Sequence, residues 1–136
     1  KLLNIKVNDD FDAIKDNALK GNKDATNKLL SSTIIEIEKS LLYIIVINQR
    51  LNKLKDIISS KGKDSIEHAI SNIKPPIFWK DKPHYFRQTK IWNLKKINKA
   101  LKITYELEIK LKSNANINKD LLIKKLLVDI CLLANS

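Results

Sequence analysis

The segment from residue 74 to residue 102 combines basic and aromatic side chains in a pattern that suits a polyanion. It contains nine lysines and arginines and one acid, Asp81, so it holds +8 of the chain's net charge of +11. Five aromatic residues lie between these cations: Phe78, Trp79, Tyr85, Phe86 and Trp92. Cations can pair with phosphates while aromatic rings stack on unpaired bases. The segment is therefore a candidate site for single-stranded nucleic acid.

Three lysines of this segment, Lys95, Lys99 and Lys102, follow one another at helical spacing and would share one face of a helix. One interpretation is an anion-facing surface. The other is a solvated stripe opposite an apolar face. The composition favours the second interpretation, because the chain has 24 lysines and only two arginines, whereas nucleic-acid contacts favour the bidentate guanidinium group.

No arrangement of side chains in the sequence indicates catalysis. The two glycines of the chain, Gly21 and Gly62, cannot form a glycine-rich phosphate loop. Glu106 and Glu108 lie two positions apart on a predicted helix and would point to different faces, so they do not form an acid–base pair. We therefore expect no catalytic residue, no cofactor and no enzymatic activity of this chain by itself.

The single cysteine, Cys131, lies within an apolar run and is expected to pack as a small buried hydrophobic side chain. One cysteine cannot form an internal disulfide, and two distant histidines, His68 and His84, do not complete a metal site. Residues 1–10 show no signal peptide, and no apolar run is long enough to span a membrane. These features predict a cytoplasmic protein that binds neither a metal nor a membrane.

The scarcity of turn-forming residues, two glycines and three prolines, predicts an all-α fold. Apolar residues recur every three or four positions. The predicted helices cover residues 11–20, 22–30, 33–60, 64–74, 83–91, 94–112 and 119–134. We expect residues 1–136 to form a single domain, a compact bundle of six or seven helices around the three longest. We also expect this domain to belong to a longer protein, because the chain has no methionine.

Local signals set the expected ends of these helices. Gly21 should end the first helix as a left-handed C-terminal residue. Thr33 and Glu36 have the spacing of a capping box, which predicts that the central helix begins at Thr33 and that its apolar positions face the core. Asn93 should cap the helix of residues 94–112. Trp92, just before that cap, is expected in the core.

Four residues are candidates for contacts with a partner protein. Tyr43 opens the run 43–47, which is apolar on all sides and predicts burial on more than one face of the central helix. Arg50 and Arg87 are the two arginines, the side chains best suited to bidentate contacts. Trp79 stands beside charged residues, so it either packs in the core or anchors a partner at the surface.

Short pieces along nearly the whole chain match, in order, the pattern of a known family. They are Phe11–Ile14 with Ala18–Asn22, Arg50–Leu51 in a long apolar helix, Pro75–Phe78 with Lys80 and Lys82–Pro83, Arg87–Gln88 with Trp92, and Leu94, Ala100–Leu101, Glu106 and Leu111–Lys112 in one helix. In this order they resemble the C-terminal part of the delta subunit of the bacterial DNA polymerase III clamp loader. The chain departs from that family in being rich in isoleucine and lysine instead of leucine and arginine.

The resemblance implies a helical collar domain that is not catalytic. Such a collar joins the delta subunit to the other clamp-loader subunits, gamma or tau and delta prime, in the heteropentamer that loads the sliding clamp during DNA replication. The sliding clamp would be contacted only through upstream domains, and the ATP sites belong to other subunits. Contact of this domain with DNA would be weak or indirect.

The basic segment supports an alternative function. The chain would then be a stand-alone helical nucleic-acid-binding module that uses the face of residues 74–102. This alternative predicts tight binding that falls steeply with salt concentration. A collar domain alone should bind DNA weakly.

Overall fold

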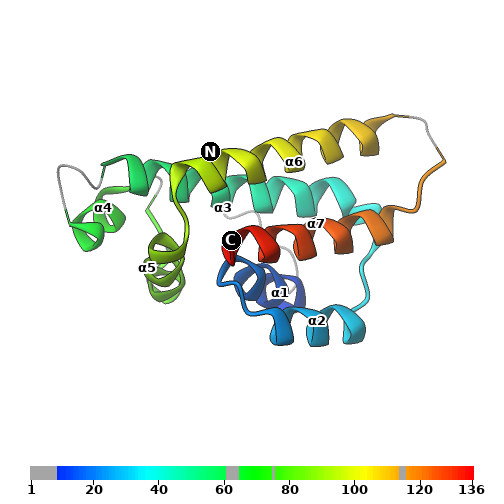
Figure 1. Cartoon of the computed structure of the whole chain (residues 1–136), viewed down its shortest axis with the longest axis horizontal. Helices are drawn as coiled ribbons and strands as arrows, with labels where there is room; N and C mark the ends of the chain where they lie inside the picture. The colour runs from blue at the N-terminus through cyan, green and yellow to red at the C-terminus, as the bar shows by residue number, and fades with distance from the viewer. Residues whose placement is uncertain (1–8, 61–64, 75, 114–115) are drawn as a thin grey trace.

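The computed structural model describes residues 9–60, 65–74, 76–113 and 116–136. Every regular element in these residues is helical, which confirms the predicted all-α fold (Figure 1). The α-helices are α1 (Asp9–Leu19), α2 (Lys23–Ser32), α3 (Ser40–Ser60), α4 (Ile66–Asn72), α5 (Lys82–Ile91), α6 (Leu94–Lys112) and α7 (Lys119–Ala134). Two short 3-10 turns, η1 (Ile37–Lys39) and η2 (Trp79–Asp81), precede α3 and α5.

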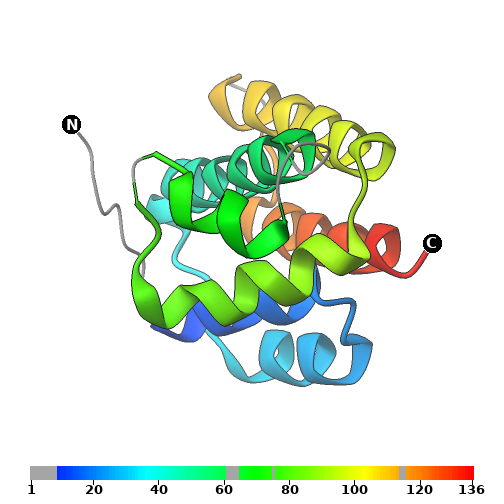
Figure 2. The same cartoon turned by 90° about the vertical axis from the view of Figure 1, so that its left-hand side faces the viewer.

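Helices α3 and α6 form the spine of the bundle. They lie side by side along its longest dimension and run in opposite directions (Figure 1). Helix α7 packs against both of them and also against α1 and α2, whereas α4 and α5 pack on α3 at the other end (Figures 1 and 2). The three longest helices therefore form the centre of the bundle, as predicted.

The turn between α1 and α2 is set by Gly21, as predicted. Its φ of +75° lies in the left-handed region that favours glycine. The N–H groups of Gly21 and Asn22 donate to the carbonyls of Ala18 and Asn17, which closes a Schellman motif. Asn135 at the other end of the chain donates from Nδ2 to the Gly21 carbonyl at 2.8 Å. This turn is therefore also a tertiary contact.

The predicted start of the central helix at Thr33 is wrong. Thr33 has an extended backbone and ends α2, and α3 begins at Ser40 after the 3-10 turn η1. The backbone N–H of Glu36, which a capping box would direct at Thr33, donates to the hydroxyl of Tyr43 at 3.1 Å instead. A tertiary hydrogen bond thus replaces the local one that the spacing indicates.

Other predicted helix ends agree with the structure. The side chain of Asn93 caps α6 by accepting a hydrogen bond from the N–H of Lys96 at 2.9 Å. Pro83 lies in the first turn of α5, where its missing N–H costs no hydrogen bond. The helix predicted over residues 64–74 is observed as α4 from Ile66 to Asn72, and position 64 lies outside the described residues.

The core contains most of the side chains expected in it, but Ile34, Ile37, Leu41 and Ile45 are exposed although their spacing predicts core positions. Phe11 of α1 stacks on Tyr43 of α3 with ring centroids 4.2 Å apart. Trp92 and Cys131 are buried as predicted, and the Trp92 Nε1 group donates to the carbonyl of Leu19 at 2.7 Å. In the run 43–47, predicted to be buried on more than one face, Tyr43, Ile44, Val46 and Ile47 are buried, whereas Ile45 on the outer face of α3 is 42% exposed.

Candidate interaction surfaces

Arg50 lies inside the molecule, only 5% exposed, where it joins three helices. Its Nη1 donates to Oδ1 of Asp16 at 2.6 Å and to Oε1 of Gln88 at 3.0 Å. Nε2 of Gln88 donates to the same Asp16 oxygen at 3.3 Å. The guanidinium carbon lies 4.3 Å from the ring centroid of Tyr85. These contacts tie α3 to α1 and to α5.

Burial and neighbouring charges shift the pKa values of Asp16 and Lys15 in this cluster. Burial raises the pKa of Asp16, but the charges of Arg50 and Lys15 outweigh burial, so this pKa lies below its ordinary value. Burial and the charge of Arg50 lower the pKa of Lys15, although Lys15 also pairs with Asp12 at 3.1 Å. Asp16 is therefore ionised at neutral pH and faces the buried guanidinium.

This cluster links three helices inside the molecule. Asp16 and Gln88 are buried, as Arg50 is. Tyr43 is also inside, 1% exposed. Two of the four residues predicted to meet a partner thus face the interior in this fold, because Tyr43 and Arg50 each complete buried hydrogen bonds. The other two, Trp79 and Arg87, are exposed.

A row of apolar side chains on the outside of the molecule is left uncovered. It comprises Ile34, Ile37, Leu41 and Ile45, with exposed fractions of 83%, 53%, 40% and 42%. Leu41 and Ile45 are one turn apart on the outer face of α3, and Ile37 lies one turn before them in η1. We call these four residues the η1–α3 ridge. Their helical spacing predicts core positions, but periodicity cannot say which apolar face a neighbouring helix will cover.

A second uncovered surface is the aromatic turn, which we define as residues 77–80. Ile77 is buried and anchors the turn, whereas Phe78 is 57% and Trp79 is 68% exposed. The two rings lie 6.0 Å apart between centroids and are tilted by 53°. Nζ of Lys80 lies 5.5 Å from the Trp79 ring centroid. Of the two predicted positions for Trp79, the structure shows the surface position.

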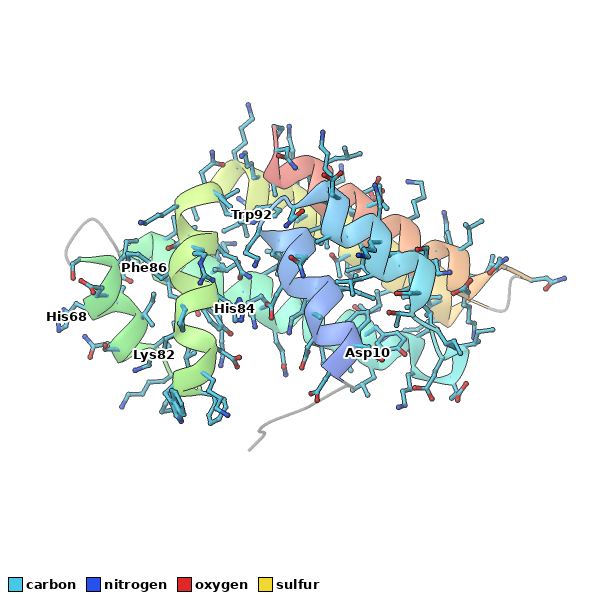
Figure 3. All side chains as sticks on the ribbon, turned by 90° about the horizontal axis from the view of Figure 1, so that it is seen from below. Asp10, His68, Lys82, His84, Phe86 and Trp92 are labelled. Atoms are coloured by element: carbon cyan, nitrogen blue, oxygen red, sulfur yellow. The ribbon has the colours of Figure 1, made fainter. Side chains whose placement is uncertain are left out.

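Helix α5 carries further cations beside this turn. Figure 3 shows Lys82 at the end of α5 where the aromatic turn joins it, with Phe86 one turn further along. Phe86 is partly buried, and Nζ of Lys90 lies 4.3 Å from its ring centroid. Arg87 is exposed on the same helix.

The three lysines predicted to face an anion are all exposed along α6. Lys95, Lys99 and Lys102 point away from the buried side of this helix. Lys96, by contrast, turns inward, and its Nζ donates to backbone carbonyls at the ends of α5 and α7 at 3.2 and 3.3 Å. The side chains of this lysine stripe are thus all open to solvent.

Comparison with known proteins assigns no function to these surfaces. No protein-family model, curated protein or solved structure matches this chain. Among the described residues, no three histidine, cysteine, aspartate or glutamate side chains gather as a metal site would require. In the same part of the chain, no helix is long and apolar enough to cross a membrane.

A hollow between α2 and α7 is too small for a cofactor or nucleotide. Its volume is about 70 Å³, and it is lined by Lys23, Thr26, Asn27, Val128, Cys131 and Leu132. Small-molecule sites usually enclose about 300–1,000 Å³. Two exposed surfaces, the η1–α3 ridge and the aromatic turn, are therefore better candidates for function than this hollow.

Proposed function

We propose that this chain is an assembly domain that docks beside sister subunits of a larger complex through the η1–α3 ridge. This proposal rests on four large aliphatic side chains that are exposed on η1, on α3 and at Ile34 just before η1. Contiguous apolar surface of this kind marks a site of protein interaction in soluble domains.

Burial of the ridge would contribute useful but limited binding energy. The four side chains expose the equivalent of about two complete isoleucines, and covering them is worth about 3–6 kcal/mol. Association costs at least that much, so the ridge must be the centre of a wider contact. Exposed Tyr105 and Ile109 of α6, the helix that packs against α3, are further apolar side chains that a wider contact could cover.

The charges around the ridge favour a protein partner over a polyanion. The ridge contains no lysine, although the chain has 24. Asn48 and Asn52 continue its row along the outer face of α3, and both are uncharged and polar. Lys39 beside the ridge pairs with Glu36 at 3.0 Å. Such a surface offers few cations to a phosphate group.

The resemblance to the clamp-loader delta subunit supports a choice of partners. A collar helix must bury one face within its own domain and another against a neighbour. Helix α3 has this form, because Tyr43 and Ile47 face the core while Leu41 and Ile45 remain exposed. The partners are then gamma or tau and delta prime, and clamp opening and ATP hydrolysis belong to other parts of the complex.

Two matched substitutions test the ridge. Leu41→Asp places a charge in it, and Leu94→Asp places the same charge on an equally exposed leucine at the other end of the spine. Both leucines lie in the first turn of a helix, where an acid suits the helix dipole. Complex formation with purified gamma or tau and delta prime is measured by size-exclusion chromatography. We expect Leu41→Asp to weaken association at least about 10-fold and Leu94→Asp to leave it unchanged.

Two outcomes would contradict the proposal in different ways. If both variants associate as well as the unsubstituted chain, the ridge is not the docking surface. If the unsubstituted chain binds none of these subunits, the clamp-loader assignment is wrong. Tight, strongly salt-dependent binding of nucleic acid by the chain alone would then favour the stand-alone module.

A further inference from the structure

We propose that the aromatic turn binds single-stranded nucleic acid, with bases stacked on Phe78 and Trp79 and phosphates paired with Lys80 and Lys74. This surface lies between α4 and α5 in the chain, whereas the η1–α3 ridge precedes and begins α3. The inference does not depend on the assembly function.

The backbone of the turn is held by hydrogen bonds within η2 and by one buried side chain. Ile77 is 6% exposed and anchors the turn in the core. Within the 3-10 turn, the N–H of Asp81 donates to the carbonyl of Phe78 at 2.8 Å, and the N–H of Lys82 donates to the carbonyl of Trp79. A preformed platform loses less conformational entropy when a ligand stacks on it.

The exposure of these two rings is selective. Tyr85 and Trp92 belong to the same aromatic segment, and both are buried. Phe78 and Trp79 are instead more than half exposed, and their 53° tilt means that the rings do not cover each other face to face. Each ring therefore keeps a face on which a base can stack.

The surroundings of the rings are positively charged. Lys80 lies over the Trp79 ring, and Lys74 is exposed just upstream. The one acid of the segment, Asp81, is half-buried, and its charge acts on Lys53 and Tyr85 of the neighbouring helices. A polyanion therefore meets lysine ammonium groups beside the rings, and a base on Trp79 would bring its phosphate within reach of Lys80.

Two features of the surface point to a single strand that is bound without strong sequence preference. Aromatic stacking requires bases that are not paired in a duplex, and every base offers a face to stack. Lysine acts as a point charge and lacks the planar fork with which arginine reads guanine, so the phosphates are bound but the base edges are not read.

Fluorescence anisotropy of a labelled oligo(dT) of about 12 nucleotides tests the platform. Trp79→Ala should weaken binding at least about 10-fold, because it removes a stacked ring. Trp79→Phe should retain most of the affinity, whereas Trp79→Leu should lose it. Tyr105→Ala is the matched control, because Tyr105 is 60% exposed and follows Lys102 on the lysine face of α6. We expect this control to bind as the unsubstituted chain does.

Intrinsic fluorescence and salt dependence give two independent readouts. Titration with unlabelled oligo(dT) should quench the emission of exposed Trp79, while buried Trp92 supplies a constant background. Lys80→Gln should reduce the slope of log affinity against log salt by about 0.7, the value for one phosphate contact on a single strand. Lys28→Gln, at an exposed position of α2, should leave the slope unchanged.

Several results would overturn the inference. It is wrong if the chain does not bind oligo(dT) at low salt, if Trp79→Ala binds like the unsubstituted chain, or if Tyr105→Ala weakens binding as much. Equal binding of oligo(dT) by the Trp79→Leu and Trp79→Phe variants would show that no base stacks on the ring at position 79. Stronger binding to phosphatidylserine vesicles than to oligo(dT) would indicate a lipid surface. Leu41→Asp should not change oligo(dT) binding, which separates this test from that of the assembly function.

Discussion

Replacing Arg50 with methionine should remove a large part of the stability of this fold. The substitution deletes the 2.6 Å ion pair with Asp16, the hydrogen bond to Gln88 and the contact with the Tyr85 ring. It also leaves an ionised carboxylate buried without its partner. Breaking a buried pair in this way costs about 3–5 kcal/mol, against a total of about 5–15 kcal/mol for a typical domain.

Urea unfolding followed by circular dichroism measures this loss. Glu108→Gln is the control, because it breaks an ion pair with Lys112 that is nearly as short, 2.8 Å, but lies at the surface. We expect the control to cost no more than about 0.5 kcal/mol. The double variant Arg50→Met with Asp16→Leu should recover much of the stability, since it leaves no unmatched charge in the core.

The same cluster predicts how stability depends on pH. The pKa of Asp16 in the folded chain lies below the ordinary value of 3.8, so near that pH the unfolded chain binds a proton more readily than the folded chain. The stability contributed by this carboxylate is therefore present above about pH 4 and is lost as pH falls through the folded pKa. In Arg50→Met this loss of stability at acid pH should disappear.

The role of the Arg50 ion pair would be refuted if Arg50→Met lowered the free energy of unfolding by less than about 1 kcal/mol and by no more than Glu108→Gln does.

Three further predictions concern the α1–α2 turn and the two tryptophans. Gly21→Ala should cost about 1–2 kcal/mol in urea unfolding, since the φ of +75° disfavours other residues and the new Cβ would lie 3.0 Å from Nδ2 of Asn135; an unchanged midpoint would contradict this. Trp92→Phe should cost about 1–3 kcal/mol by leaving the carbonyl of Leu19 without its donor, and no loss would show that the hydrogen bond is unimportant. Acrylamide should quench the fluorescence of exposed Trp79 and leave that of buried Trp92 unchanged. Equal quenching of both tryptophans would show that Trp92 is not buried.

Helices with consistent local signals could be predicted from the sequence. For α6, the cap at Asn93 and the apolar spacing from Ile97 to Leu111 agree, and the observed bounds match the predicted ones. The start of α3 could not be predicted, because the hydroxyl of Tyr43 takes the N–H of Glu36. That competing hydrogen bond depends on the tertiary fold, so no local sequence pattern predicts it.

The candidate surfaces were less predictable than the helices. Arg50 and Asp16 are 34 residues apart in the sequence, and nothing near either residue indicates the pairing. The apolar spacing of Leu41 and Ile45 is the same as that of core residues, so only the packed bundle shows that none of the described helices covers them. Trp79 had two open interpretations, and its neighbours in sequence could not decide between them.

Photo-crosslinking from the ridge is the most direct test of the assembly account. A benzoylphenylalanine is placed at position 45 or, as the control, at position 94, where the side chains are equally exposed. Each chain is irradiated together with gamma or tau and delta prime. The account predicts a crosslink to a sister subunit from position 45 and none from position 94. Crosslinks from position 94 alone would contradict it.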